Sequence, residues 1–465
     1  MLRHIKKWLL IILCTLPIMS SALDIQQAYS LAMSNSNRVK ASQEAYQAAS
    51  SEASIGTRLW LPSINAEGFL NRGDFSGSST TTRADFDGVD IIARETLFDY
   101  SAIAEAMGAK YVRQLALYKD KLVQQQEIRE TIKAYFDVLL ARRLLRAATL
   151  NKQLLKTGLY QIKVAKELHL KTPDEVAFIQ SDYDDAIADY LRARTAYSDS
   201  IAQLEHKVQQ PVNTICPLKS NVIFHIQPPP PLRVWEQRAR KYNLAIRALQ
   251  VGEALANKRV SMELGKHLPT ISAVGSYNVL HNKGVLAYDG RVYGIAANNT
   301  HLHGYLIGLK ASIPLFSGGV VSAEVASAEH KRQEIFYKLA QVEADIQLKT
   351  RNDYLMLLTD YAKVKAQRSA MRASHEAYTL RVNEMHEHTK TELDVLKAQA
   401  KYDLASQKYE ESIFDYFKRY INLHADAGEL NNAVIFEINQ YVNTKHNIRI
   451  TQFDRYPLSR SMLKT

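Results

Sequence analysis

Two hydrophobic periods alternate along the chain, and the longest stretches follow the helical one. They are rich in Ala, Leu, Gln, Glu and Lys and run without helix breakers: proline is absent from Ser63 to Thr172 and from Leu315 to Tyr456, and glycine from Val320 to Ala427. This composition favours helix. At 1.5 Å per residue, roughly 70 helical residues extend about 100 Å. A single globular core cannot bury such a rod, so we expect it to pack against other helices, from its own chain and from others.

Shorter stretches alternate apolar and polar residues, which is the period of a β-strand. We predict four strands, at about 61–72, 84–97, 269–280 and 302–316. The segments between paired strands, 73–83 and 281–301, are rich in Gly, Ser, Thr, Asn and Tyr, which indicates exposed loops. One apolar and one polar face suit a membrane barrel wall, and equally a half-buried sheet of a soluble protein. Two hairpins cannot close a barrel within one chain, so a barrel would need several chains.

The two halves of the chain repeat one pattern. A Leu-Pro pair opens a strand at Leu61 and again at Leu268, and a Leu-Phe pair ends one at Leu97 and again at Leu315. Within the helical stretches, tyrosines recur every seven residues in both copies: Tyr183, Tyr190, Tyr197, Tyr402, Tyr409 and Tyr416. A seven-residue stripe indicates one helix face packed on a neighbouring helix. Each copy is therefore predicted to run helix, strand, loop, strand, very long helix, turn, helix.

This repeat sets the expected domain boundaries. Residues 23–210 form the first copy and residues 232–430 the second. Between them, residues 211–231 hold six prolines and should form an extended linker. Residues 431–465 are polar and lack repeat character, so we expect a tail that is wrapped around the rest or disordered.

Residues 1–22 have the pattern of a secretory signal peptide. Arg3, Lys6 and Lys7 precede an apolar stretch from Trp8 to Met19, and small residues up to Ala22 suit cleavage there. The apolar stretch is shorter than the roughly 20 residues that span a bilayer as a helix, which disfavours a retained anchor. No later apolar run reaches about 18 residues, so we predict no membrane-spanning helix.

Cysteine content, charge and the lack of certain motifs exclude several kinds of bond and function. The mature chain would keep one cysteine, Cys216, and could form no internal disulfide. The net charge is +11, or +8 once Arg3, Lys6 and Lys7 are removed. The charges are mixed in sign and form no compact basic run with aromatics, so nucleic-acid binding is not expected. No Walker A loop, Rossmann glycine pattern, nucleophile elbow or HExxH motif occurs, so we predict a protein without enzymatic activity or cofactor.

The duplicated order and several local motifs resemble the TolC family of outer-membrane factors. The motifs are the Leu-Pro strand openings, the strand-closing segment PLFSGG (314–319), and the segment TELDVLKAQ (391–399) that begins the last long helix. The resemblance covers residues 23–430. It implies a mainly helical fold with a membrane β component. In that fold a homotrimer builds one 12-stranded barrel from four strands per chain, continued by a long periplasmic helical tunnel.

The same resemblance implies a function. It is that of the outer-membrane exit duct of a tripartite efflux pump or a type I secretion system in a Gram-negative bacterium. The implied partners are a periplasmic adaptor (membrane fusion) protein, an inner-membrane transporter that supplies the energy, and outer-membrane lipid. The alternative is a secreted structural coiled-coil protein, similar to an adhesin and without a pore. It explains the long helices but not the paired hairpins with matched borders.

The two turns within the helical stretches hold the candidate site. Thr172 can cap a helix, proline suits the next position, and Glu175 can complete a capping box. Thr391 and Asp394 hold the matching places in the second copy. The resemblance adds a second role for Glu175 and Asp394 at a periplasmic aperture, where a ring of carboxylates from three chains attracts cations. A second acidic ring of the family would lie where this chain has Lys397, which predicts a less cation-selective entrance.

The turns are also the expected adaptor-docking surface, which comprises His169, Lys171, Thr172, His388, Lys390 and Thr391. Family members usually have glycine at the places of His169 and His388, so either the partner is specialised or the turn has another backbone. Imidazoles with a pKa near 6.5 also suggest a pH-sensitive tip. A metal site at His386 and His388 is not expected, because residues two apart do not share a helix face and no well-spaced third ligand accompanies them.

Overall fold

The computed structural model describes residues 22–58, 61–76, 81–219, 229–283, 285–288, 291–295, 300–387, 389 and 391–455. The chain divides into two compact units. The helical unit comprises Met1–Gln43, Asp120–Leu244 and Glu343–Thr465, and the sheet unit comprises Glu44–Lys119 and Ala245–Val342. The long helices run through both units, and each unit is described by itself.

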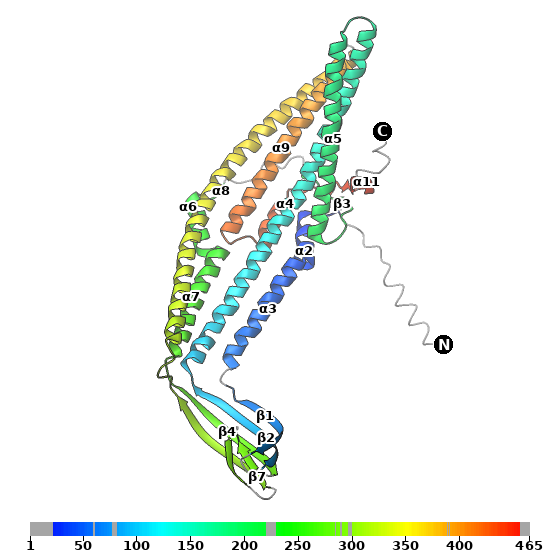
Figure 1. Ribbon diagram of the computed structural model, residues 1–465. Coiled ribbons are helices and arrows are strands. Elements are labelled where there is room, and N and C mark those ends of the chain that lie inside the picture. Colours follow the sequence, from blue (N-terminus) through cyan, green and yellow to red (C-terminus); the bar gives the residue numbers. More distant parts are fainter. Residues whose placement is uncertain are drawn as a thin grey trace, which may run out of the picture. The chain divides into compact units, whose positions relative to one another are not determined.

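A four-stranded antiparallel sheet with the order β1-β2-β4-β7 dominates the sheet unit (Figure 1). Its strands are β1 (Ser63–Ser76), β2 (Thr81–Phe98), β4 (Thr270–Lys283) and β7 (Thr300–Ser312). They correspond to the four predicted strands, but the hairpins extend further into the loops and β7 ends earlier than expected. The second loop contains a short strand pair that was not predicted, β5 (Val285–Tyr288) and β6 (Arg291–Ile295). An Asp-Gly pair between two apolar runs was the sequence signal for it.

The strand register gathers the apolar side chains on one face. Ala66 lies opposite Ile91, Ile91 opposite Tyr277, and Tyr277 opposite Tyr305, so one row crosses all four strands. Directly opposed residues share a face, and so do residues two apart along each strand. The exposed apolar residues on this face are Ile64, Leu70, Val89, Ile91, Ile271, Tyr277, Tyr305, Ile307 and Leu309. The other face also exposes Leu302 and Leu306, but it is more polar and carries Asn65, Glu67, Asp90, Arg94, Ser276, Asn278 and Lys310.

Close backbone packing joins the helices of the sheet unit. They are parts of α3 (Asn37–Arg58), α4 (Tyr100–Glu167) and α8 (Val320–His386), with α7 (Leu244–Gly265). A Cβ added at Gly265 would stand 2.7 Å from the backbone nitrogen of Ser101, so only glycine fits there. The Ser101 hydroxyl donates to the carbonyl of Met262 at 2.8 Å. The end of α7, just before β4, is thereby fastened to the start of α4, just after β2.

The helical unit has the main hydrophobic core. Besides parts of α3, α4 and α8, its helices are α2 (Ile25–Asn35), α5 (Pro173–Val208), α6 (Leu232–Tyr242), α9 (Glu392–Asp426), α10 (Asn432–Asn439) and α11 (Gln452–Arg455). Phe136 of α4 stacks on Phe414 and Phe417 of α9, with ring centroids 5.0 and 5.9 Å apart. Of the tyrosine stripe, Tyr183, Tyr190 and Tyr402 are half-buried, whereas Tyr197, Tyr409 and Tyr416 are at most 4% exposed and pack as predicted. These tyrosines therefore form helix contacts rather than a ligand surface.

Both ends of the described chain are tied into this core. Leu23 pairs with β3 (Thr214–Ile215), and its backbone nitrogen donates to the Thr214 carbonyl at 2.9 Å. The tail expected to be wrapped or disordered packs through α10 and β8 (Ile448–Arg449), with Ile435 and Ile438 fully buried. The composition of the segment did not indicate this packing, because a few apolar residues in a polar segment are enough to form one buried helix face.

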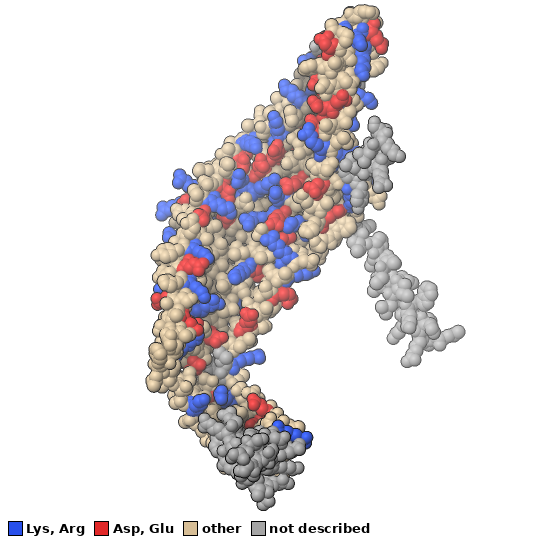
Figure 2. Space-filling view, viewed as in Figure 1, with Lys and Arg blue, Asp and Glu red and all other residues tan. Residues whose placement is uncertain are grey.

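The helices of the described chain carry mixed charge, and none of them is long and apolar enough to cross a membrane. Figure 2 shows Lys and Arg interspersed with Asp and Glu over the helices on the face in view. This mixed pattern is that of solvated helix faces on the side in view.

Candidate functional site at the two helical turns

The first turn joins α4 to α5 and begins with a closed helix end. Leu170 donates its backbone N–H to the Ala165 carbonyl at 2.9 Å, and His169 donates to the Lys166 carbonyl at 2.9 Å. This bond pair is the Schellman motif, which needs a left-handed residue after the helix. His169 is that residue, with a φ of 57°. The turn therefore has the backbone for which glycine is the usual choice, although a histidine occupies it.

α5 then starts with a complete capping box. Glu175 Oε2 accepts from the Thr172 backbone N–H at 3.0 Å and from the Thr172 hydroxyl at 3.1 Å, while Lys171 Nζ donates to Glu175 Oε1 at 2.5 Å. These bonds favour the ionised carboxylate. The Lys171 ammonium, followed by the Thr172 amide, lowers the pKa of Glu175 to about 2. Glu175 is thus ionised at neutral pH, with its oxygens turned toward its own helix start.

The second turn, between α8 and α9, follows the same plan. Thr389 donates its backbone N–H to the Glu384 carbonyl at 2.9 Å, which is the longer of the two Schellman bonds. Asp394 Oδ2 accepts from the Thr391 backbone N–H at 3.2 Å and from the Thr391 hydroxyl at 2.9 Å. The Asp394 N–H donates back to the Thr391 hydroxyl at 3.3 Å. Both acidic residues predicted at an aperture therefore form helix caps.

The other predicted site residues are placed only in part. Lys397 is exposed and lies one helical turn after Asp394 on α9. His388 and Lys390 lie outside the described residues. A Cβ at Gly158 would stand 4.0 Å from Leu393 Cδ1, so the start of α9 lies against α4 near the end of that helix. The two turns therefore belong to the same end of the helical unit.

Exposed apolar side chains around the first turn were missed by the sequence analysis. They are Tyr160, Leu168, Leu170 and Phe178, which are 64–72% exposed. All four lie within ten residues of His169, in a region that otherwise carries charge and hydrogen-bonding groups. The sequence contained a signal for them, because Leu168 and Leu170 flank His169 on both sides. Exposed apolar groups beside a polar turn are typical of a protein-docking surface.

Ion pairs tie the helices together behind the turns. Arg143 of α4 donates to both carboxylate oxygens of Glu410 on α9, at 2.7 and 2.5 Å. Arg419 of α9 donates to Asp353 on α8 at 3.1 Å. A two-pronged arginine–carboxylate contact fixes orientation as well as distance. The neighbouring helix pairs are therefore held by specific polar links as well as by the core.

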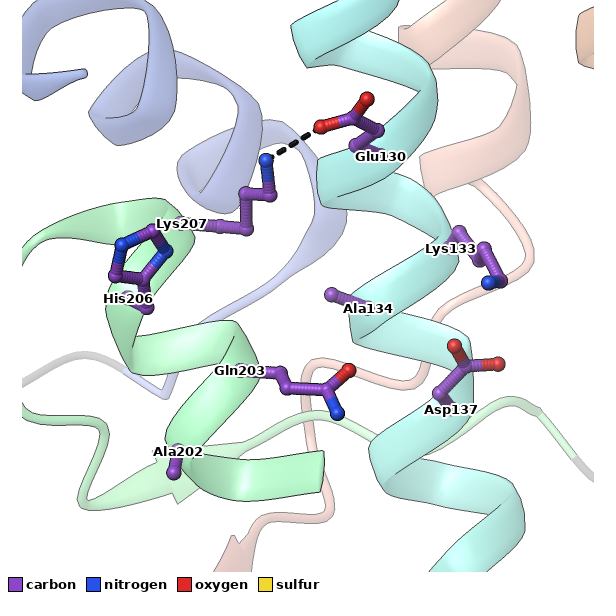
Figure 3. Close-up of a pocket in the computed structure, with 8 residues that line it drawn as sticks. All are labelled: Glu130, Lys133, Ala134, Asp137, Ala202, Gln203, His206 and Lys207. Atoms are coloured by element: carbon purple, nitrogen blue, oxygen red, sulfur yellow. Dashed lines mark hydrogen bonds and ion pairs between the residues drawn. The ribbon is translucent and has the colours of Figure 1, made fainter. Parts of the chain in front are cut away.

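A cavity of about 420 Å³ lies between α4 and α5, away from the turns. Its lining is Glu130, Lys133, Ala134, Asp137, Ala202, Gln203, His206 and Lys207 (Figure 3). Lys207 donates to Glu130 at 2.5 Å and lies 3.5 Å from Glu127, so the principal charges are already paired. Partial burial raises the pKa of Glu130, but hydrogen bonds from Lys207 and Gln126 and the charges of Lys207 and Arg38 outweigh it, so the pKa is lowered overall. The cavity is a polar gap between packed helices and brings together no nucleophile–base pair.

Comparisons with known proteins agree with this architecture. The family model described as "Outer membrane efflux protein" matches residues 235–425. TolC of Escherichia coli strain K12 is 21% identical over 316 residues, which are 68% of this chain and 64% of TolC. The alkaline protease secretion protein AprF of Pseudomonas aeruginosa is 22% identical over 429 residues, covering 89% of this chain and 86% of AprF. The Campylobacter jejuni CmeC outer membrane channel has the same fold, with a TM-score of 0.70 at 14% identity over 90% of this chain and 89% of CmeC.

The chain belongs to the TolC family of outer membrane efflux proteins. This is a family of channels rather than enzymes, and its members lie in the outer membrane with a helical part in the periplasm. The suspected family, the mainly helical fold with four strands in two hairpins, and the non-enzymatic channel function are thereby confirmed.

The resemblance to the TolC family led us to expect glycine at the first turn, where this chain has His169. His169 itself adopts the left-handed backbone conformation that glycine usually supplies. The turn therefore needs no different backbone to accommodate a histidine. What changes is the side chain presented there, an imidazole between Leu168 and Leu170. A specialised docking partner remains the other prediction.

Proposed function

We propose that the chain forms, as a homotrimer, a passive exit duct through the outer membrane. Each chain would contribute its four-stranded sheet to a shared 12-stranded barrel and its long helices to a periplasmic tunnel. The observation that carries this proposal is the apolar face that crosses all four strands without a change of side. β1 and β7 are the edges of the sheet, and pairing them with further copies would close the barrel and remove its exposed edges.

The helical turns are proposed as the point of opening and docking. Glu175 and Asp394 would surround a periplasmic aperture, with Lys397 reducing its net negative charge. A periplasmic adaptor would dock on His169 and Lys171 together with the exposed apolar residues of the first turn, and an inner-membrane transporter would supply energy and cargo. Glu175 and Asp394 already cap their helices, so an opened state has to preserve these caps or replace their bonds.

Membrane insertion tests the barrel directly, and β7 offers a matched pair of variants. Ile307 lies on the apolar face and is 84% exposed, while its neighbour Leu306 lies on the opposite face and is 61% exposed. A lysine facing lipid near the bilayer midplane costs about 2–4 kcal/mol, whereas a lumen-facing lysine costs little. We expect wild-type protein and Leu306→Lys to form discrete conducting openings in a planar bilayer, and Ile307→Lys to insert poorly.

Each contrary result has a distinct meaning. Poor insertion of Leu306→Lys together with normal insertion of Ile307→Lys would reverse the face assignment but keep the channel. Well-folded wild-type protein that never inserts would contradict the channel and favour a structural coiled-coil protein. Heat-modifiable trimers on electrophoresis provide an independent check of the oligomer.

A further inference from the structure

A row of polar side chains crosses three strands of the sheet on the face that also carries the exposed apolar residues. Asp87 of β2 lies opposite His281 of β4, and His281 lies opposite His301 of β7. Because directly opposed residues share a face, all three side chains stand on the same side of the sheet. They also touch: His281 Nδ1 lies 3.2 Å from Asp87 Oδ2, and the His281 and His301 rings are 4.5 Å apart between centroids.

A third histidine stands beside this row. His303 follows His301 by two residues on β7, so it shares their face, and it lies opposite Val279. Opposed residues have Cβ atoms about 4.5–5.5 Å apart, and diagonal neighbours about 7–8 Å. His281, His301 and His303 therefore form a triangle whose sides allow three imidazoles to meet at one point.

Asp87 sets the chemistry of the first imidazole. An ionised carboxylate can only accept a hydrogen bond, so the proton of His281 belongs on Nδ1 and the lone pair on Nε2. A histidine held this way through its other nitrogen is the usual arrangement of a metal ligand and its supporting carboxylate. The side chains are exposed, with those of His281 and Asp87 at 44% and 53%, and His301 and His303 are exposed as well.

We propose that His281, His301 and His303 bind one borderline divalent metal ion of the Zn²⁺ or Cu²⁺ class, with Asp87 orienting His281. Imidazole nitrogen is a preferred ligand for this class, and three histidines with one open position make a familiar tetrahedral set. As the side chains stand, no three metal-binding groups of the described chain converge on one point. Ligation therefore requires the exposed rings to rotate while the strands stay in place. A bound ion would fasten the edge strand β7 to β4.

Zn²⁺ binding by the full-length protein tests this directly. The protein is purified in detergent without a polyhistidine tag and titrated with Zn²⁺ by calorimetry, with the visible absorption of Co²⁺ as a check on tetrahedral geometry. We expect one ion per chain. His281→Ala, His301→Ala and His303→Ala should each weaken binding by at least about tenfold, and Asp87→Asn by about tenfold, as removal of a supporting carboxylate typically does.

His267→Ala is the matched control, because His267 is an exposed histidine of the same unit outside this row. It should leave the affinity unchanged. Binding that persists in the three row variants, or that is lost only in the control, would overturn the proposal. Absence of any zinc binding by folded protein would also overturn it and leave the row as an ordinary histidine–aspartate ion pair. The titration needs no conducting pore, so its outcome is independent of the channel experiment.

Discussion

Asp394 has two proposed roles, and two substitutions separate them. In the structure its carboxylate accepts two hydrogen bonds from Thr391 and so caps α9. In the proposed channel its charge lines the aperture. Asp394→Ala removes both the cap and the charge. Asp394→Asn removes the charge but keeps an oxygen of nearly the same position that can still accept from Thr391.

The expected size of the capping effect follows from these bonds. Losing a helix-capping side chain costs about 1 kcal/mol. Since 1.4 kcal/mol corresponds to a factor of ten, opening of the first turn of α9 should become roughly fivefold more frequent in Asp394→Ala. Asp394→Asn loses only the attraction between a carboxylate and the helix N-terminus, which contributes about 0.3–1 kcal/mol. Its opening should increase by less than in the alanine variant.

Two measurements follow the two roles. Hydrogen exchange of a peptide covering the start of α9 reports the cap, and the reversal potential in a salt gradient reports the charge. If both roles hold, the variants differ in exchange but lose the same cation preference. Exchange that is unchanged in Asp394→Ala would refute the cap, and wild-type cation preference in Asp394→Asn would refute the aperture.

Three further predictions concern stability. A double-mutant cycle on Arg143 and Glu410 should give a coupling of about 1 kcal/mol in denaturant unfolding, at the upper end for partly exposed pairs, because the contact is bidentate; zero coupling would contradict the proposed link between α4 and α9. Gly428→Ala should lower the free energy of unfolding by about 2–5 kcal/mol, since the φ of Gly428 is 69° and a Cβ would stand 2.1 Å from a carbonyl oxygen of α6. Gly318→Ala is the control, because its φ is 63° and a Cβ would meet nothing within 4 Å. It should lose only the stability that the left-handed backbone costs an alanine, without the steric clash. The pKa of Glu175 is lowered from 4.5 to about 2, so its stabilisation is present above pH 4.5 and lost as the pH falls toward 2; exchange at the start of α5 should accelerate over that window relative to Glu175→Gln at the same pH, and parallel profiles would contradict the capping box.

Local physics made much of this protein predictable from its sequence. Helix propensity and the absence of breakers indicate the long helices, alternation indicates the strands, and Thr172 and Thr391 mark helix starts because capping depends on residues only three apart. The order of the elements was predictable as well, because the same pattern occurs twice in the chain. The family resemblance rested on the same features.

Tertiary structure decided what depends on residues far apart in the chain. The row of Asp87, His281 and His301 exists only because β2 pairs with β4 at one register, and a slip of one residue would move each side chain to the other face. The packing of Leu393 near Gly158, and of the apolar tail residues in the core, likewise follows from long-range contacts. The sequence by itself thus determined the elements and their caps, while pairing and packing determined which of their side chains meet, because these contacts join segments that no local pattern relates.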